Sequence, residues 1–211
     1  TISGATGARV LGDDVVVTST GTVNWTGGSF TQGAGAGSVS TTANTTGNIS
    51  ITATTGNVTM LNPISAAGTS AGNITVTAPA AAAITLGEVS GSGTVTVNGA
   101  NTTAMGFTST VDAGALVAND TGSALTFDGD VTVGSMQVNG TTGTRVIGDD
   151  VVVDATGAIT IAGASITQGA GAGSITATSN TTGNISITAS GGNLTLLNPI
   201  TASGTSAGNV T

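Results

Sequence analysis

Residues 47–52 read Gly-Asn-Ile-Ser-Ile-Thr, and residues 72–77 read Gly-Asn-Ile-Thr-Val-Thr. In both stretches a β-branched apolar residue alternates with a small polar one, and this period of two indicates a β-strand with one buried face. The Gly-Asn pair before each run supplies the turn that bounds a short strand. The alternation recurs at residues 94–97, 130–133 and 158–161. The sequence therefore predicts many short strands.

The composition supports an all-β chain with an ordered core. Glycine accounts for 35 of the 211 residues, and charged residues make up only 6%. Because Gly, Thr, Val and Asn are poor helix formers, long helices are not expected. The apolar fraction of 38% argues against disorder, and the chain has no cysteine for disulfides or thiolate metal sites.

A long internal repeat sets the organisation of the chain. Residues 9–17, Arg-Val-Leu-Gly-Asp-Asp-Val-Val-Val, return at residues 145–153 with one conservative change. The same offset relates residues 1–75 to residues 137–211 without a gap. We therefore predict a first repeat unit at 1–136 and a truncated second unit at 137–211, within one continuous solenoid that is a fragment of a longer chain.

The strands can be arranged as a parallel β-helix or as an antiparallel sandwich. A sandwich usually has aromatic anchors in its core, whereas this chain has one Trp, three Phe and no Tyr. A β-helix needs only stacked Val, Ile, Leu and Ala inside it. We predict a parallel β-helix with about 20 residues per coil, and so about seven coils in each full repeat unit.

The repeats carry a family resemblance. The motifs at residues 47–52, 56–59, 72–77 and 93–98 resemble those of filamentous-haemagglutinin-like exoproteins of Gram-negative bacteria, which are exported by two-partner secretion. The resemblance implies a right-handed β-helix located outside the cell. It also implies a structural or adhesive segment of a secreted surface fibre, acting as a stiff stalk or filament. Its expected partners are the chain itself, through repeats that stack end to end in the same chain and through lateral association, and host or environmental surfaces or glycans.

Charge and hydropathy exclude other partners. The formal net charge is −8, and Arg9 and Arg145 are the only basic residues, so a nucleic-acid backbone would be repelled. No apolar run approaches the ~18 residues needed to cross a bilayer, so membrane insertion is not expected.

Aspartates next to glycines are the candidates for chemistry. The sequence Gly-Asp-Asp occurs in both repeat units, and similar carboxylate pairs occur in β-helical enzymes that cleave polysaccharides. Adjacent strand residues point to opposite faces, and the chain has no His or Lys to complete an acid–base set, so we do not expect an enzyme. Carboxylates beside Gly turns are also weak candidates for calcium, the only cofactor considered. These residues are Asp13, Asp14, Asp128, Asp130, Asp149, Asp150 and Asp154. The competing interpretation is a corner ion pair with Arg9 or Arg145.

The sequence leaves further hypotheses open. Asn-x-Ser/Thr motifs make Asn48, Asn73, Asn184 and Asn209 weak glycosylation candidates, although Asn at a turn before an alternating Thr produces the same pattern. Thr-x-Thr pairs on a flat solenoid face suggest ice binding as another hypothesis. Two alternatives to a stalk are a carbohydrate-binding or degrading β-helix and a surface-layer or pilus subunit of β-sandwich domains that assemble by strand donation.

Overall fold

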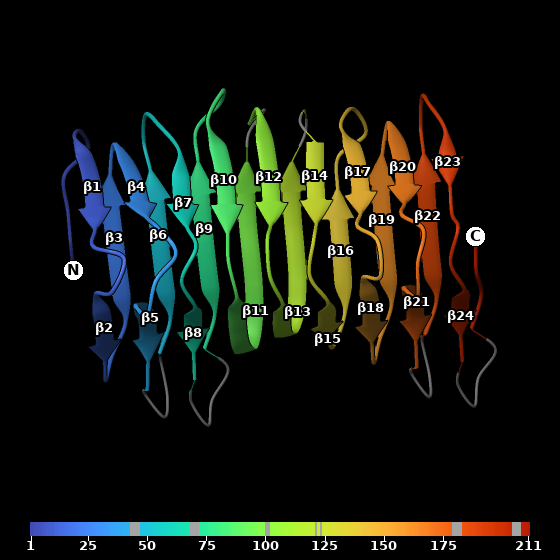
Figure 1. Ribbon diagram of the computed structural model, residues 1–211, viewed down its shortest axis with the longest axis horizontal. Coiled ribbons are helices and arrows are strands. Elements are labelled where there is room, and N and C mark those ends of the chain that lie inside the picture. The colour runs from blue at the N-terminus through green and yellow to red at the C-terminus, as the bar shows by residue number, and fades with distance from the viewer. Residues whose placement is uncertain are drawn as a thin grey trace.

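The computed structural model describes residues 1–42, 47–67, 72–99, 102–120, 122, 124–178, 183–203 and 208–211, except the side chain of residue 120. The described residues form 24 strands and no helix, and every pair of neighbouring strands is parallel. Figure 1 shows the strands side by side along the long axis, with the two termini at opposite ends. The predicted parallel β-solenoid is confirmed, and the β-sandwich alternative is wrong.

Each coil of the solenoid contributes a strand to each of three faces, except the last coil, in which Val210 on face 3 makes only an isolated bridge with Ile185. We call the nine-stranded sheet face 1. Its strands, in spatial order, are β1 (Ala8–Leu11), β4 (Ser29–Gln32), β7 (Val58–Met60), β10 (Ala83–Leu86), β12 (Ala104–Phe107), β14 (Ala124–Phe127), β17 (Thr144–Ile147), β20 (Ser165–Gln168) and β23 (Leu194–Thr195).

Face 2 follows face 1 in every coil. Its strands are β2 (Val16–Ser19), β5 (Ser38–Thr41), β8 (Ile64–Ala66), the first part of β11 (Val89–Gly99), the first part of β13 (Val111–Asp120), β15 (Val131–Val133), β18 (Val152–Ala155), β21 (Ser174–Ala177) and β24 (Ile200–Ala202).

Face 3 closes each coil. Its strands are β3 (Val23–Gly27), β6 (Ile49–Ala53), β9 (Ile74–Ala78), the second parts of β11 and β13, β16 (Met136–Asn139), β19 (Ile159–Gly163) and β22 (Ile185–Ala189). Because β11 and β13 run through both faces, faces 2 and 3 belong to one hydrogen-bonded sheet.

The register shows that the coils differ in length. Leu125 pairs with Arg145, which closes a short coil, whereas Phe30 pairs with Val58, which closes a longer one. The longer coils have most of their extra residues between faces 2 and 3, as between Thr41 and Ile49, and the coil that starts at Phe30 also has a longer turn between faces 1 and 2. From Arg9 to Arg145 the face 1 register takes six steps, not the expected seven. The predicted coil length of about 20 residues therefore fits most coils, including the one from Arg9 to Phe30, but not the long coils such as the one from Phe30 to Val58.

The core fills the space between the three faces. Strand β6 alternates buried and half-buried residues, with Ile49, Ile51 and Ala53 pointing inward. The inward residues stack in register from coil to coil, and Phe107 lies on Phe127 with ring centroids 5.2 Å apart and planes 3° from parallel. Trp25 and Phe30, which the second unit replaces with Ile161 and Ile166, are also buried and stacked. Each coil therefore buries its apolar residues against its neighbours, as expected for a repeat protein.

Candidate functional site: the acidic corner

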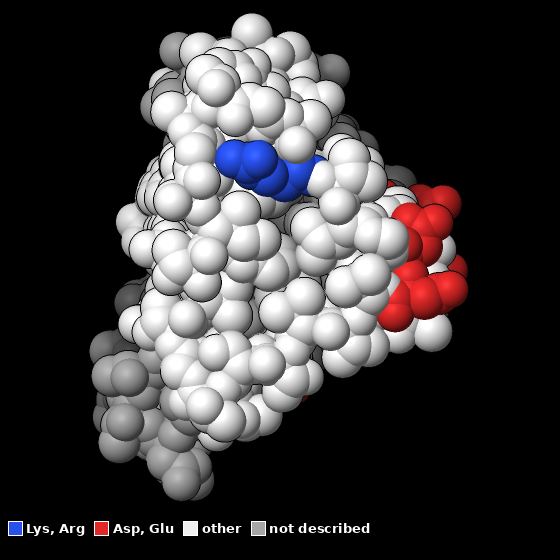
Figure 2. Space-filling view, turned by 90° about the vertical axis from the view of Figure 1, so that its left-hand side faces the viewer, with Lys and Arg blue, Asp and Glu red and all other residues white. Residues whose placement is uncertain are grey.

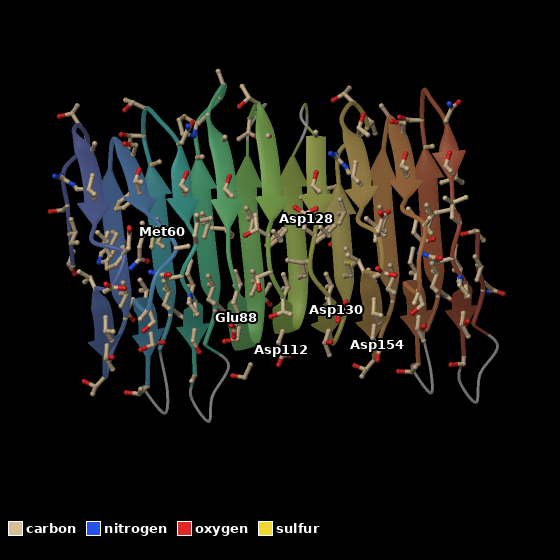
Figure 3. All side chains as sticks on the ribbon, in the orientation of Figure 1. Met60, Glu88, Asp112, Asp128, Asp130 and Asp154 are labelled. Atoms are coloured by element: carbon tan, nitrogen blue, oxygen red, sulfur yellow. The ribbon has the colours of Figure 1, made fainter. Side chains whose placement is uncertain are left out.

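Most carboxylates of the chain lie along one edge of the solenoid. We define the acidic corner as the turns between faces 1 and 2 that carry Asp13, Asp14, Glu88, Asp128, Asp130, Asp149 and Asp150. Asp112 and Asp154 lie beside it on face 2. Figure 2 shows acidic side chains gathered on one corner of the end-on outline, away from the basic ones. Figure 3 shows Glu88, Asp112, Asp130 and Asp154 on strands and turns of different coils.

The corner aspartates bind the backbone of the following coil. Asp13 Oδ1 accepts a hydrogen bond from the Gly33 amide at 3.0 Å, and Asp14 Oδ1 accepts one from the Ala36 amide at 2.9 Å. In the second unit, Asp150 Oδ1 accepts one from the Ala172 amide at 2.6 Å. These carboxylates satisfy amides that the turn leaves without a ladder partner, which stabilises the corner.

The turn above each Asp pair is made of small residues because the two coils approach closely. A Cβ added at Gly35 or Gly37 would lie 2.6 Å from the carbonyl oxygen of Asp13. Only glycine fits at such distances, and this explains why the repeat keeps Gly-Ala-Gly-Ala-Gly at residues 33–37 and 169–173. The glycine run and the Asp pair therefore form one structural unit.

Buried amide side chains complete this corner, and the sequence analysis missed them. Gln32 and Asn62 are buried; Gln32 Nε2 donates to the Val15 carbonyl at 3.2 Å, and Asn62 Oδ1 accepts from the Gly35 amide at 2.8 Å. Asn62 Nδ2 also donates to the Asp13 carbonyl. The second unit repeats the pair as Gln168 and Asn198. Their recurrence at the offset of the long repeat, on an inward phase of the strand, was the available signal.

The second arginine lies in the core, so the expected ion pair between Arg145 and the corner aspartates is wrong. Arg145 is 1% exposed and occupies an inward position of face 1 between Leu125 and Ile166. Its Nε donates to the Ala162 carbonyl at 2.8 Å, and Nη2 donates to the carbonyls of Asn139 and Gly140. Arg145 is therefore directed to the corner between faces 3 and 1, away from the Asp pairs.

The two Asp pairs lie too far apart to act together as one acid–base site. The two Gly-Asp-Asp copies lie six coil steps apart, or ~29 Å at ~4.8 Å per step, whereas a glycosidase needs two carboxylates within ~10 Å. Among the described residues, no three His, Cys, Asp or Glu side chains come close enough together to hold a metal ion. Calcium at Asp13, Asp14, Asp128, Asp130, Asp149, Asp150 or Asp154 would need mainly backbone oxygens as ligands, and it stays a prediction.

A shallow groove lies where faces 2 and 3 meet. Its volume is about 510 Å³, and its lining includes Ser65, Ser90, Ser92, Asp112 and Gly114. Ser90 Oγ donates to Ser65 Oγ at 3.0 Å, so part of the polar lining is satisfied within the protein. None of the described residues that line the groove is an aromatic on which a sugar ring could stack.

The asparagines with glycosylation motifs lie at the corner between faces 2 and 3. Asn48 Oδ1 accepts a hydrogen bond from the Asn73 amide at 2.9 Å, and Asn73 Oδ1 accepts one from the Thr94 amide at 2.8 Å. Asn184 and Asn209 repeat this contact in the second unit at 3.1 Å. The turn role is thus shown for Asn48, Asn73 and Asn184, and glycosylation at the four sites stays a prediction.

The outward-facing residues of face 3 are relevant to the ice-binding hypothesis, which requires a regular row of hydroxyl groups. Ser50, Thr75 and Thr96 lie in register, but the next positions are Val117 and Gln137. The hydroxyl row therefore does not continue over the full length of the face.

No family model, curated protein or solved structure matches this chain in comparisons of all three kinds. The resemblance to filamentous-haemagglutinin-like exoproteins therefore depends on the repeat motifs themselves. Among the described residues, no helix has the length and apolar character required to cross a membrane.

Proposed function

We propose that this chain is a stiff, repetitive segment of an extracellular surface fibre and that it holds an adhesive part away from the cell. The observation that carries the proposal is the continuous register of face 1, which passes from the first repeat unit to the second through Leu125 and Arg145 without interruption. Strand pairing is confined to adjacent coils, so the length of such a rod grows in proportion to the number of coils.

Two further observations support this proposal over a catalytic or sugar-binding role. The corner carboxylates with described contacts are used to bind backbone amides of the next coil. In the part of the chain that the structure describes, no aromatic residue lines the groove at the junction of faces 2 and 3. The surface location and the adhesive role are supported by the repeat motifs and by the low content of charged residues.

The absence of cysteine allows a direct test of stiffness. Thr31 and Thr167 are exposed, equivalent positions of face 1, six coil steps apart. Spin labels on the double variant Thr31→Cys/Thr167→Cys should give one narrow distance distribution centred near ~29 Å plus the label linkers. A pair within one coil, Thr31→Cys/Ser40→Cys, is the control for the width that the linkers contribute. A distribution for the long pair much broader than the control would contradict a stiff segment.

A further inference from the structure

Two Asn-Gly pairs occur in the chain, Asn98-Gly99 and Asn139-Gly140. In such a pair the backbone nitrogen of the glycine can attack Cγ of the asparagine side chain, because glycine has no Cβ to hinder the approach. The attack requires a backbone amide without a hydrogen-bond acceptor and a main chain that can leave the extended form. The two pairs differ in both respects.

The first pair lies inside a sheet. Asn98 and Gly99 belong to β11, and both residues pair with β9 on one side and with β13 on the other. Gly99 is also buried. The two neighbouring strands hold this pair in the extended form, so its backbone nitrogen cannot turn toward the Asn98 side chain.

The second pair lies at the end of a strand. On one side β16 pairs with β13 through Asn139, but on the other side it pairs with β19 only as far as Val138. Gly140 follows the strand with a φ angle of 125°, and among the described residues none accepts a hydrogen bond from its amide nitrogen. The nucleophile of this pair is therefore available at a point where the chain already bends.

A buried guanidinium contacts the peptide unit that reacts. Arg145 is 1% exposed, and its Nη2 donates to the carbonyl oxygens of Asn139 at 3.3 Å and of Gly140 at 3.4 Å. The Asn139 carbonyl oxygen belongs to the same peptide unit as the Gly140 nitrogen, so it takes much of the negative charge when that nitrogen loses its proton. A positioned donor at low dielectric constant stabilises such a charge.

The carbonyl group under attack is polarised as well. Gln137 Nε2 donates to Asn139 Oδ1 at 3.1 Å, and this donor stabilises the charge that develops on Oδ1 during the attack. Asn98 Oδ1 also accepts a hydrogen bond, from Asn119 Nδ2 at 2.9 Å. The difference between the two pairs therefore lies in the nucleophile and its surroundings.

We propose that Asn139 is a site of spontaneous deamidation that the fold favours. Hydroxide from the solvent takes the Gly140 amide proton, the Gly140 nitrogen bonds to Asn139 Cγ, and Nδ2 leaves as ammonia after it takes a proton from water. Water then opens the cyclic imide at either of its carbonyl groups and leaves aspartate or isoaspartate at position 139. The net reaction consumes one water and releases one ammonia.

The product weakens the contact between neighbouring coils. Asn139 Nδ2 donates to Asn119 Oδ1 at 2.7 Å, and a carboxylate at position 139 has no proton to donate there. Isoaspartate also adds a methylene group to the main chain, which disturbs the register at the end of β16. The reaction needs only these residues and water, so it does not depend on the proposed function.

Mass spectrometry tests this proposal. The folded 211-residue chain is incubated in mildly alkaline buffer made with heavy-oxygen water, and peptides released by pepsin at low pH are quantified. Asn139 should lose its amide and take up the label about tenfold or more faster than Asn98. In urea, where the sheets are absent, the two Asn-Gly pairs should react at similar rates.

Matched variants test the contacts of the site. Gln137→Ala removes an exposed donor and should slow the reaction of Asn139 several-fold. Thr160→Ala, which changes the residue paired with Gln137 on β19, is the control and should leave the rate unchanged. Circular dichroism checks that both variants keep their strands.

Three outcomes would overturn the proposal. In the first, Asn139 of the folded chain keeps its amide as long as Asn98 does. In the second, the difference between the two pairs persists in urea, which would assign it to the local sequence and not to the fold. In the third, Gln137→Ala reacts as fast as the parent chain.

Discussion

Arg9 and Arg145 occupy the same position of the repeat but differ in their surroundings. Arg145 is 1% exposed, lies between Leu125 and Ile166, and donates from Nε to the Ala162 carbonyl. Arg9 is only half-buried on the outermost strand of face 1, and its buried Nε has no hydrogen-bond partner in the structure. The sequences around the two arginines are nearly identical. The difference therefore comes from the coil that covers Arg145.

This comparison shows that the stability of a residue in the solenoid is supplied largely by the adjacent coils. In a repeat protein the free energy of unfolding is a sum of terms for each repeat and for each contact between neighbours. Two residues at equivalent positions of the repeat, one in an inner coil and one in an outermost coil, have the same residue type and nearly the same local sequence. Substituting each of them in turn therefore measures how much the neighbouring coils contribute to the free energy of unfolding.

The largest effect is expected for the arginines themselves. Arg145→Ala should lower the free energy of unfolding by about 4 kcal/mol, because it removes a buried side chain and leaves several carbonyls without a donor. Arg9→Ala should cost less than about 1 kcal/mol. Urea denaturation followed by circular dichroism measures both. Equal losses would show that the covering coil contributes nothing at this position.

A smaller difference is expected for an apolar pair. Ile64 is fully buried between Val39 and Val89, whereas its equivalent Ile200 pairs only with Ile175 at the edge. Ile64→Ala should cost about 3 kcal/mol, and Ile200→Ala should cost about 1 kcal/mol, because a cavity forms only where the site is enclosed. Thermal denaturation of the two variants, scanned at one protein concentration, ranks them. An Ile200→Ala loss as large as that of Ile64→Ala would contradict this prediction.

The smallest effect is expected for the corner asparagines. Asn73→Ala removes the acceptor of the Thr94 amide and should cost about 1 kcal/mol. In this 211-residue segment, Asn209→Ala should change the free energy of unfolding by only a few tenths of a kcal/mol, because none of the described residues donates a hydrogen bond to the Asn209 side chain. Hydrogen exchange of the Thr94 amide gives a local measure and should become faster in Asn73→Ala alone. Unchanged exchange in that variant would show that the amide is protected by other contacts.

Much of this fold could be predicted from the sequence. The alternation at residues 47–52 gave β6, and the gapless long repeat together with few aromatics favoured a β-helix over a sandwich. The number of coils could not be predicted, because coils of different length each add one layer to the solenoid. The short coil from Leu125 to Arg145 and the long coil from Phe30 to Val58 are examples. The extra residues lie in the turns, mostly between faces 2 and 3, and leave the periodicity within the strands unchanged.

The contacts of the acidic corner were predicted less well. An arginine and an Asp pair close in sequence suggested an ion pair, but Arg145 shares the inward phase of Ile147 on β17. The phase of the alternation was thus a better guide than sequence proximity. It identifies Gln32 as well, which shares the inward phase of Phe30. The backbone partners of Asp13 and Asp14 lie about one coil further along the chain, and this distance depends on the coil length that the sequence left open.

The coil lengths also bear on how the chain reaches this structure. Each strand pairs only with strands one coil away along the chain, for example Leu125 with Arg145 and Phe30 with Val58. The loop-closure entropy of adding a coil is therefore nearly the same anywhere in the solenoid and does not increase with total length. A chain with many more repeats would close no longer loops than this one. We expect coil addition to proceed at a similar rate however long the array becomes.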